Sequence, residues 1–494
     1  MNLNIDQIYQ EGFKAHKNGN LKDAQNNYLN ILKIMPNHSE ANHNMGLIAI
    51  SLKKLELSEE YFKKAIKNNL NKPKYWYNLS ISFKAQKKID KALECLFHLI
   101  KIDKNYFKAY NLIGVLYNEQ GKLDLAIEYF EKGLSLKKDI EIYFNLGNVY
   151  NSKNNTSKSI KYYKKALEIN PNHLKTLNNL GNTFSEINNL DEAIKCFKRV
   201  LEIFPDDNYI KINLSNVYCK KGDFLNAKTI LKTLNDRDSV AQYFECLYRL
   251  FDAKSFIKEI KEIKLKDKSN IRLASISAFA SHQLKIKNHY PFCETPLKMI
   301  YKTNLNKHLK NQKAFISNII NEIGNKPSIL NKKNTNTVSG YQSVGDLFSN
   351  PSNHLKTLNE IINLEMQKYK NKFSKFNCHL INAWPEKYKV GGWFVRYFKS
   401  GHQKPHVHPF GWISGVFYLK TISNPINNEG AINFGIHGYD YPILNKKIPS
   451  LLIQPNDGEL VLFPSSLFHS TIPIKKNEER IVIAFDMMPL VDNT

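Results

Sequence analysis

A repeat of about 34 residues runs from residue 5 to about residue 235. Each unit has a small residue, a second small residue twelve positions later, and a large apolar residue four positions after that. The first small residues are Gly12, Gly46, Ser80, Gly114, Gly147, Gly181 and Ser215; the second are Ala24, Ser58, Ala92, Ala126, Ser159, Ala193 and Ala227. The large residues are Tyr28, Phe62, Leu96, Phe130, Tyr163, Phe197 and Leu231. This period predicts stacked helix-turn-helix units, in which small residues let two helices approach and the large one fills the gap against the next unit.

Three units end in prolines that cannot continue the preceding helix, and one unit has a tryptophan near its start: Pro36, Pro171, Pro205 and Trp76. The pattern resembles the tetratricopeptide repeat family. The resemblance implies an α-solenoid whose concave groove binds a protein or peptide. Four asparagines on predicted first helices could grip an extended backbone there: Asn111, Asn145, Asn178 and Asn179. Alternatively, the repeats only hold the rest of the chain in place or mediate self-association.

Residues 236–335 lose the repeat spacing but keep helical patterns, which predicts a helical bridge. A segment with two prolines, Pro291 and Pro296, interrupts it and predicts an ordered crossing. From Gly340 the pattern changes to β. One helix is expected over residues 354–373, followed by strands at 379–384, 392–398, 412–420, 431–437, 450–454, 459–463, 469–474 and 480–488.

About eight strands behind one helix is the content of a double-stranded β-helix, or jelly roll, in which two sheets enclose a cavity. We therefore expect a multidomain α + β protein. Its parts are an α-solenoid over residues 1–235, a helical bridge over 236–335 and a jelly roll over 336–494.

Three histidines in the β region have the spacing of metal ligands. His406 and His408 are separated by one residue, so in a strand their side chains lie on one face. His469 follows an apolar strand and a turn. Three protein ligands leave coordination positions open, as a catalytic metal site requires. The competing interpretation is three satisfied structural histidines.

Four motifs follow in order: H-x-H at 406–408, S-G-V-F-Y-L at 414–419, G-x-L-x-x-F-P-x-x-x-x-H at 458–469 and E-E-R-I-V-I-A-F at 478–485. Together they resemble the 2-oxoglutarate and Fe(II)-dependent oxygenases, particularly oxygenase domains attached to tetratricopeptide repeats. The resemblance covers residues 336–490 and implies Fe(II), 2-oxoglutarate and O2, with His406, His408 and His469 as metal ligands.

The same resemblance implies a cosubstrate site. Arg480 would pair with the remote carboxylate of 2-oxoglutarate, for which a guanidinium is a bidentate partner. Tyr418 would add its hydroxyl, and Ser414 on the same strand face is a weaker candidate. Three residues on strands before the metal motif could face the pocket: Asn382, Arg396 and Tyr397.

A hairpin between residues 469–474 and 480–488 would place these groups. With a turn at 475–478, His469 pairs with Ala484 and Arg480 lies on the same face, about 13 Å along the strand at roughly 3.3 Å per residue. The small Ala484 would keep room for a five-carbon diacid.

His408 stands where most of these oxygenases have a carboxylate. Three interpretations stay open: a three-histidine iron site, a site in which Asp440 or Asp486 supplies the carboxylate, and a degenerate domain that binds without turnover. We favour the first, since Arg480 and Tyr418 are retained.

The function expected is therefore a dioxygenase that hydroxylates a C–H bond, with repeats that recruit a protein or peptide. One alternative is a non-catalytic scaffold in which the repeats bind partners. Another is a three-histidine or cupin-like enzyme that does not use 2-oxoglutarate.

The formal net charge of +26 would ordinarily suggest nucleic acid, but lysines are spread along almost every predicted helix, so nucleic acid is not the expected partner. The six cysteines are scattered without a C-x-x-C, which favours a reducing compartment. We expect neither a signal peptide nor a membrane span, and a cytoplasmic location. The sequence leaves the oligomeric state open.

Overall fold

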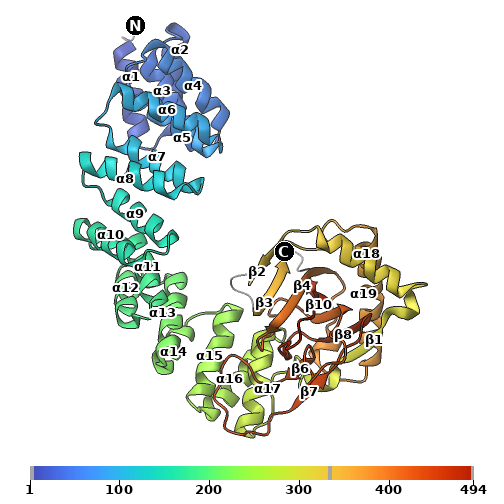
Figure 1. Cartoon of the computed structure of the whole chain (residues 1–494). Coiled ribbons are helices and arrows are strands. Elements are labelled where there is room, and N and C mark those ends of the chain that lie inside the picture. The colour runs from blue at the N-terminus through green and yellow to red at the C-terminus, as the bar shows by residue number, and fades with distance from the viewer. Residues whose placement is uncertain (1–4, 332–335, 491–494) are drawn as a thin grey trace. The chain divides into compact units, whose positions relative to one another are not determined.

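The computed structural model describes residues 5–331 and 336–490 (Figure 1). The chain divides into two compact units, residues 1–217 and 218–494. The division falls inside helix α13 (Asn208–Lys221), so the boundaries expected after residues 235 and 335 remain predictions. Within the described ranges, no helix combines the length and the apolar character needed to cross a bilayer.

The first unit consists of helices that pack on one another in sequence order (Figure 1). They are α1 (Ile5–Lys17), α2 (Leu21–Ile34), α3 (Ser39–Ser51), α4 (Leu55–Asn68), α5 (Pro73–Ala85), α6 (Ile89–Ile102), α7 (Phe107–Glu119), α8 (Leu123–Leu136), α9 (Ile140–Ser152), α10 (Thr156–Ile169), α11 (Leu174–Glu186) and α12 (Leu190–Ile203), followed by the start of α13. This is the helical repeat solenoid that the 34-residue period predicts.

The turns inside the repeats share one backbone feature. A residue with positive φ recurs at the same position of each unit: Gly19, Lys53, Lys87, Gly121, Asn154, Asn188 and Gly222. A left-handed residue just after a helix terminates it and redirects the chain. After that turn, the side chains of Asn20 and Asn155 cap α2 and α10 by accepting backbone N–H groups. The helix ends in each repeat are therefore set by turn and capping residues as well as by packing.

The small residue of each first helix lies against the large residue of its own second helix. A methyl group added to Gly46 would lie 2.6 Å from the Phe62 ring, and one added to Gly147 would lie 2.3 Å from the Tyr163 ring. This contact closes each helix pair from within. The large residue also fills the gap against the next unit, as the repeat predicts, because Phe62 shares a buried cluster with Tyr75 and Leu79 of the following helix.

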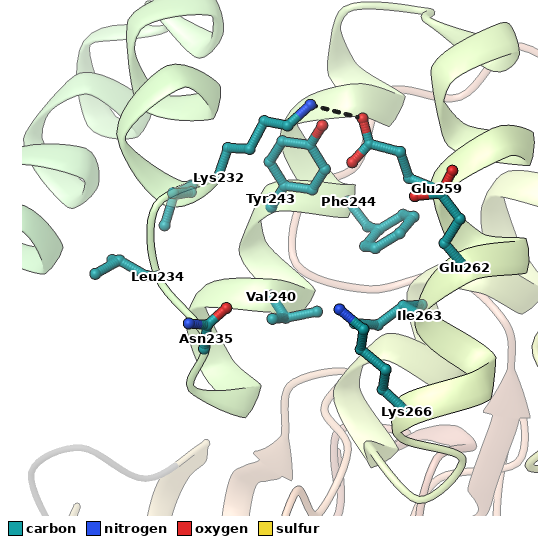
Figure 2. A pocket seen from close by; sticks show the side chains of 11 residues that line it. Lys232, Leu234, Asn235, Val240, Tyr243, Phe244, Glu259, Glu262, Ile263 and Lys266 are labelled. Atoms are coloured by element: carbon teal, nitrogen blue, oxygen red, sulfur yellow. Dashed lines mark hydrogen bonds and ion pairs between the residues drawn. The ribbon is translucent and has the colours of Figure 1, made fainter.

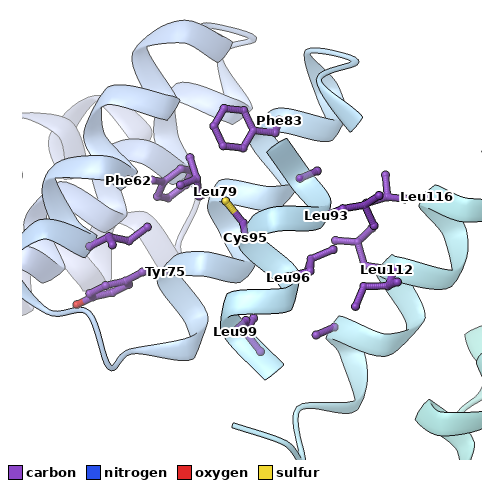
Figure 3. Close-up of a cluster of buried hydrophobic side chains, with 14 of the residues drawn as sticks. Phe62, Tyr75, Leu79, Phe83, Leu93, Cys95, Leu96, Leu99, Leu112 and Leu116 are labelled. Carbon is purple, nitrogen blue, oxygen red and sulfur yellow. The ribbon is translucent and has the colours of Figure 1, made fainter. Parts of the chain in front are cut away.

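Consecutive pairs then share a continuous core. Figure 3 shows Phe62 from α4, Leu79 from α5, Leu96 from α6 and Leu112 from α7 in one buried cluster. Each repeat is too small to bury its apolar face alone, so stability comes from contact with its neighbours.

We expect Gly147→Ala to lower the stability of the first unit by about 1–3 kcal/mol, because the added methyl group overlaps a buried ring that has no room to move. The midpoint of urea unfolding measures this change. Ser152→Ala on the exposed face of the same helix is the matched control and should stay within about 0.5 kcal/mol. Equal effects of the two substitutions would contradict the close approach of α9 and α10.

The second unit begins with helices and continues into two antiparallel sheets. Its helices are α14 (Phe224–Leu231), α15 (Arg237–Arg249), α16 (Ala253–Lys266), α17 (Ile271–Leu284), η1 (Pro296–Met299), η2 (Leu305–His308), α18 (Gln312–Gly324), α19 (Asn353–Lys372) and α20 (His379–Asn382). Its strands are β1 (Tyr301–Asn304), β2 (Ser328–Leu330), β3 (Thr337–Ser343), β4 (Tyr388–Gln403), β5 (Ile413–Lys420), β6 (Ile432–Gly435), β7 (Ser450–Ile453), β8 (Glu459–Pro464), β9 (Phe468–Thr471) and β10 (Arg480–Pro489).

The larger sheet has the strand order β1-β8-β5-β10-β4-β3-β2, and the smaller has the order β7-β6-β9. Side chains from both sheets form one core, including Val395, Val416, Phe434, Phe463 and Val482. The central strands β5, β8 and β10 are buried along nearly their whole length, which explains their continuous apolar runs. The predicted fold class, a repeat solenoid followed by a β-sheet domain, is confirmed.

Three local predictions were wrong. Residues 379–384 were expected to form a strand, but they contain the helix α20, whose first N–H groups donate to Pro291 O and Phe292 O. Residues 301–304, expected in a helical bridge, form β1 and pair with β8. The hairpin that paired His469 with Ala484 does not exist, because β9 pairs with β6 in the smaller sheet while β10 pairs with β4 and β5 in the larger one.

Candidate metal centre

The three predicted ligand histidines come together where the two sheets meet. His406 and His469 form an isolated bridge in which each backbone N–H donates to the other's carbonyl at 3.1 Å. The backbone N–H of His408 donates to Ser465 O at 3.1 Å. One ring nitrogen from each histidine lies within 4.8 Å of the other two, so their lone pairs can meet at one ion.

The hydrogen bonds behind the rings decide which nitrogen faces the centre. Nδ1 lies 2.7 Å from Lys404 O in His406, 2.7 Å from Asp486 Oδ1 in His408 and 3.2 Å from Leu467 O in His469. An acceptor at that position keeps the proton on Nδ1 and leaves a lone pair on Nε2. The Nε2 atoms of His406 and His408 are 3.2 Å apart. Two unprotonated nitrogens facing each other cannot hydrogen-bond, and a shared cation resolves that conflict.

Burial keeps two of the rings neutral. Loss of solvent, and secondarily the proximity of His408, lowers the pKa of His406 to about 3. Burial lowers the pKa of His469 well below its usual range, and the other two histidines add to this shift. Both rings are therefore unprotonated at neutral pH and available as metal ligands.

The carboxylate of Asp486 lies behind His408 and does not join the cluster. Its Oδ1 also accepts from Ser414 Oγ at 2.7 Å, and Ser414 Oγ lies 2.8 Å from Ser465 Oγ. Ser414, a candidate for cosubstrate binding, is therefore engaged in this chain of hydrogen bonds. Asp440, the other carboxylate considered for the metal, lies in the loop after β6, where its backbone carbonyl accepts from Arg249. Among the described residues, the metal-ligand cluster contains histidines alone.

Arg480 is buried beside two buried tyrosines. Its guanidinium carbon lies 5.2 Å from the ring centres of both Tyr397 and Tyr418. Nε of Arg480 and the hydroxyls of both tyrosines are buried without a hydrogen-bond partner. Burial raises the pKa of Tyr418 to about 12 and that of Tyr397 further, so both stay protonated donors. One cation and two phenol donors without an acceptor fit a carboxylate ligand.

Glu479, next to Arg480 in the sequence, and Glu429, whose neighbour Gly430 lies beside the Arg480 side chain, both face other groups. Glu479 pairs with Arg396 at 3.1 Å. Glu429 accepts the backbone N–H groups of Lys475 and Lys476. Within the described part of the chain, Arg480 forms no ion pair, which leaves its charge available to a bound anion.

The strand register places Arg480 and Asp486, the hydrogen-bond partner of His408, at two ends of one face of β10. On β10, Arg480, Val482, Ala484 and Asp486 share one face of the sheet, and Asp486 contacts His408. Arg480 and Asp486 are six positions apart, about 20 Å of strand. The guanidinium lies between Tyr397, which pairs with Arg480, and Tyr418, which pairs with Val482 one step closer to Asp486. Ala484 pairs with Val416 in the interval, where small side chains suit a slender diacid.

A pocket of about 200 Å³ opens beside the histidines. Its walls are His406, His408, Val407, Trp393, Pro409, Phe410, Asp486 and the amide side chains of Asn336, Gln342 and Gln403. Phe410 is 78% exposed and also lines a neighbouring pocket of about 460 Å³. Phe410 was not among the residues predicted for the site, although its position two residues after the H-x-H motif could have indicated it.

The remaining candidates lie elsewhere. Asn382 is exposed on α20 and donates to Asn377 Oδ1. Arg396 faces a different pocket with Tyr341 and Phe398. Of the three weaker pocket candidates, only Tyr397 lies beside Arg480.

The pocket in Figure 2 is unrelated to this chemistry. It lies among α14, α15 and α16, and it is lined by apolar residues such as Val240 and Phe244. Lys232 and Glu259 form an ion pair at its rim at 3.2 Å. No histidine or cysteine lines it, so we assign it no metal.

Family models match segments in both the N-terminal and the C-terminal part of the chain. Residues 391–486 match the family described as "Putative 2OG-Fe(II) oxygenase". Residues 39–72 and 105–206 match tetratricopeptide repeat families. The chain therefore carries tetratricopeptide repeats and, near its C-terminus, a domain of that oxygenase family.

Several solved structures are similar to parts of this chain. MamA is 28% identical and covers 32% of this chain and 92% of its own, with a TM-score of 0.30. YrrB, described as a TPR protein with an unusual peptide-binding site, is 21% identical over 40% of this chain and 96% of its own, with a TM-score of 0.31. The Cut9–Hcn1 structure is 19% identical over 49% of this chain and 48% of its own, with a TM-score of 0.39. No curated protein sequence matches this chain.

Proposed function

We propose that this repeat protein with a 2-oxoglutarate/Fe(II) oxygenase-family domain is an active dioxygenase that hydroxylates a protein or peptide partner. His406, His408 and His469 would hold Fe(II), and Arg480 with Tyr418 would bind the far carboxylate of 2-oxoglutarate. With O2, these groups supply an oxidation in which 2-oxoglutarate becomes succinate and CO2 while a substrate C–H becomes C–OH.

One observation supports this proposal: the residues that suit a metal and those that suit a carboxylate lie near the two ends of one face of β10. Ring nitrogens of three histidines can meet at one cation, and a buried guanidinium with two phenol hydroxyls can bind an anion. A ligand with a metal-binding end and a carboxylate end suits both groups. Tyr397 would assist Tyr418, while buried apolar side chains around Val482 exclude water.

The chain's own residues have distinct tasks. The acceptors behind the three rings hold each Nε2 toward the centre, so little reorganisation is needed when the metal binds. The two tyrosines hold the guanidinium and can donate to a carboxylate oxygen. Trp393 stacks near the His408 ring, with centroids 5.6 Å apart, and forms one wall of the pocket that would admit the substrate.

Conversion of 2-oxoglutarate into succinate, without any added substrate, tests the proposal. We expect purified protein to form succinate when Fe(II) is supplied and to stop when the metal is chelated. Well-folded protein that neither binds Fe(II) nor forms succinate would instead favour the scaffold, in which the repeats bind partners and the β domain is a degenerate binding module.

The repeats suit recruitment of a polypeptide. Asn145 donates to Asn111 at 2.9 Å and Asn213 donates to Asn178 at 3.3 Å, each pair linking first helices of neighbouring repeats. Such amides retain further donors and acceptors for an extended backbone. All six cysteines are free thiols, which is compatible with the cytoplasm as the compartment we propose.

Phe410 should contribute to substrate binding. Peptides selected from a random library against protein loaded with Mn(II) and N-oxalylglycine should bind Phe410→Ala at least about tenfold more weakly, because truncating an aromatic anchor costs more than about 1 kcal/mol. Fluorescence anisotropy measures this affinity. Phe398→Ala removes a 40% exposed phenylalanine from another pocket and is the matched control. Equal affinities for both variants would place the binding surface elsewhere.

A further inference from the structure

We infer that Asp486 is a positioning residue that supplies, from behind His408, the negative charge missing from the metal-ligand set. This inference rests on the proposed function, because it concerns how the three-histidine site would hold Fe(II). It explains why His408 can stand where related oxygenases have a carboxylate ligand. The carboxylate of Asp486 does not contact the ion itself but acts through the imidazole of His408.

The three histidines differ in the group that accepts the hydrogen bond from Nδ1. His406 and His469 each face a backbone carbonyl, Lys404 O and Leu467 O. His408 alone faces a carboxylate, at 2.7 Å. The single charged acceptor is therefore paired with the one histidine that stands where related oxygenases have a carboxylate ligand.

The charge of the site follows from this pairing. Two histidines and one carboxylate reduce the charge of a divalent ion from +2 to +1, whereas three neutral histidines leave it at +2. A carboxylate hydrogen-bonded to a ligand imidazole makes that ligand more basic and returns one negative charge to the site. With Asp486 included, the net charge is again +1.

The surrounding residues keep this carboxylate in place. Ser414 donates to the same Oδ1, and Ser465 lies within hydrogen-bond distance of Ser414. A methyl group at Gly411 would lie 2.6 Å from Ser465 Oγ and 3.2 Å from Asp486 Cγ. Glycine at position 411 therefore leaves room for the series of hydrogen bonds that connects Ser465, Ser414, Asp486 and His408. The backbone N–H of His408, bonded to Ser465 O, ties the histidine to the same group.

Two measurements test the inference without relying on turnover. The first is ¹⁵N NMR of the metal-free wild-type protein, in which His408 should carry its proton on Nδ1. The second is Co(II) affinity, followed by the visible absorption of the bound ion. Asp486→Asn keeps the shape but removes the charge, so affinity should fall about 10–100-fold, the usual effect of losing such a partner.

Ser414→Ala is the matched control, because it removes a hydrogen bond from the same carboxylate but leaves its charge. It should keep the Nδ1 tautomer of His408 and lose less than about threefold in Co(II) affinity, below the loss of the carboxylate itself. A proton on Nε2 of His408 in the wild-type protein would overturn the inference, even if Asp486→Asn does not fold. Asp486→Asn that binds Co(II) as tightly as Ser414→Ala would also overturn it.

If the proposed oxygenase function is wrong, the measurements will differ from those that would overturn the role of Asp486. Wild-type protein that binds Co(II) but forms no succinate would contradict the oxygenase, while the tautomer and the affinity ratio would still decide the role of Asp486.

Discussion

His469→Ala is expected to abolish Fe(II)-dependent formation of succinate from 2-oxoglutarate and to weaken metal binding by at least about 100-fold. The expectation follows from geometry, since Nε2 of this residue is one of three ring nitrogens within 4.8 Å. Losing only an outer partner of a ligand costs about 10–100-fold, so loss of the ligand itself should exceed that range. Succinate formation and Mn(II) binding by calorimetry measure the two effects.

Two controls separate the loss of a ligand from damage to the fold. The His469 ring is buried and lies 4.7 Å from the Phe463 ring, so truncation leaves a cavity. His469→Gln retains most of the volume and should fail in the same way. His402→Ala removes a partly exposed histidine whose Nδ1 lies near Ser400 O, and it should leave both measurements unchanged. Retained activity in His469→Gln would remove this residue from the metal site.

Metal binding should also stabilise the protein, and this gives a readout without catalysis. A ligand at 100 times its dissociation constant adds about 2.7 kcal/mol to the unfolding free energy. Mn(II) should therefore raise the melting temperature of wild-type protein and of His402→Ala, but not that of His469→Ala. Identical shifts in all three would mean that the ion binds elsewhere.

Spacing in the sequence predicted those parts of the structure that rest on local contacts. The small and large residues of each repeat are sixteen positions apart, as in Gly46 and Phe62, and they meet because a helix pair returns the chain by that length. The spacing predicted that the large residue packs against the next unit, and Phe62 does so beside Tyr75 and Leu79. Its contact with the small residue of its own helix pair became visible only in the three-dimensional structure.

The strand and the hairpin were predicted wrongly because residues distant in sequence determine the structure of both segments. Residues 379–384 read as an alternating strand, but Pro291 O and Phe292 O, far away in sequence, accept their N–H groups. After β9 the chain crosses to the other sheet, and the buried carboxylate of Glu429 holds that crossing through Lys475 N and Lys476 N. Neither partner is visible in the residues that form the segment, so a local pattern could not reveal them.

The histidines were found in spite of the wrong hairpin because two separate sequence features mark them: the H-x-H spacing of His406 and His408, and the motif that ends at His469. In the structure, a backbone bridge ties His469 to His406. The position of Asp486 behind His408 required the pairing of β10 with β5, which sets Asp486 opposite Ser414. The sequence named Asp486 as a possible ligand, and the register shows why its carboxylate faces an imidazole instead.

Arg480→Met is expected to raise the Michaelis constant for 2-oxoglutarate by at least about 100-fold while metal binding stays unchanged. Two hydrogen bonds from a guanidinium to a carboxylate are each worth about 1.5–3 kcal/mol, and about 1.4 kcal/mol corresponds to a factor of ten. The metal affinity should stay unchanged because Lys404 O, Asp486 and Leu467 O, and not Arg480, position the three histidine rings. Succinate formation across a range of 2-oxoglutarate concentrations measures the constant.

The stability of this variant provides a second, independent outcome. The buried guanidinium has no ion pair among the described residues and packs between two rings. Replacing an unpaired buried charge with an apolar side chain of similar length should leave the metal-free protein as stable as before, or more so. Arg396→Met removes an arginine that pairs with Glu479 on the outer side of the sheet, and it should not change the 2-oxoglutarate dependence. If Arg480→Met kept full succinate formation with an unchanged Michaelis constant for 2-oxoglutarate, Arg480 would not bind the cosubstrate, and the unsatisfied hydroxyls of Tyr397 and Tyr418 would need a different ligand.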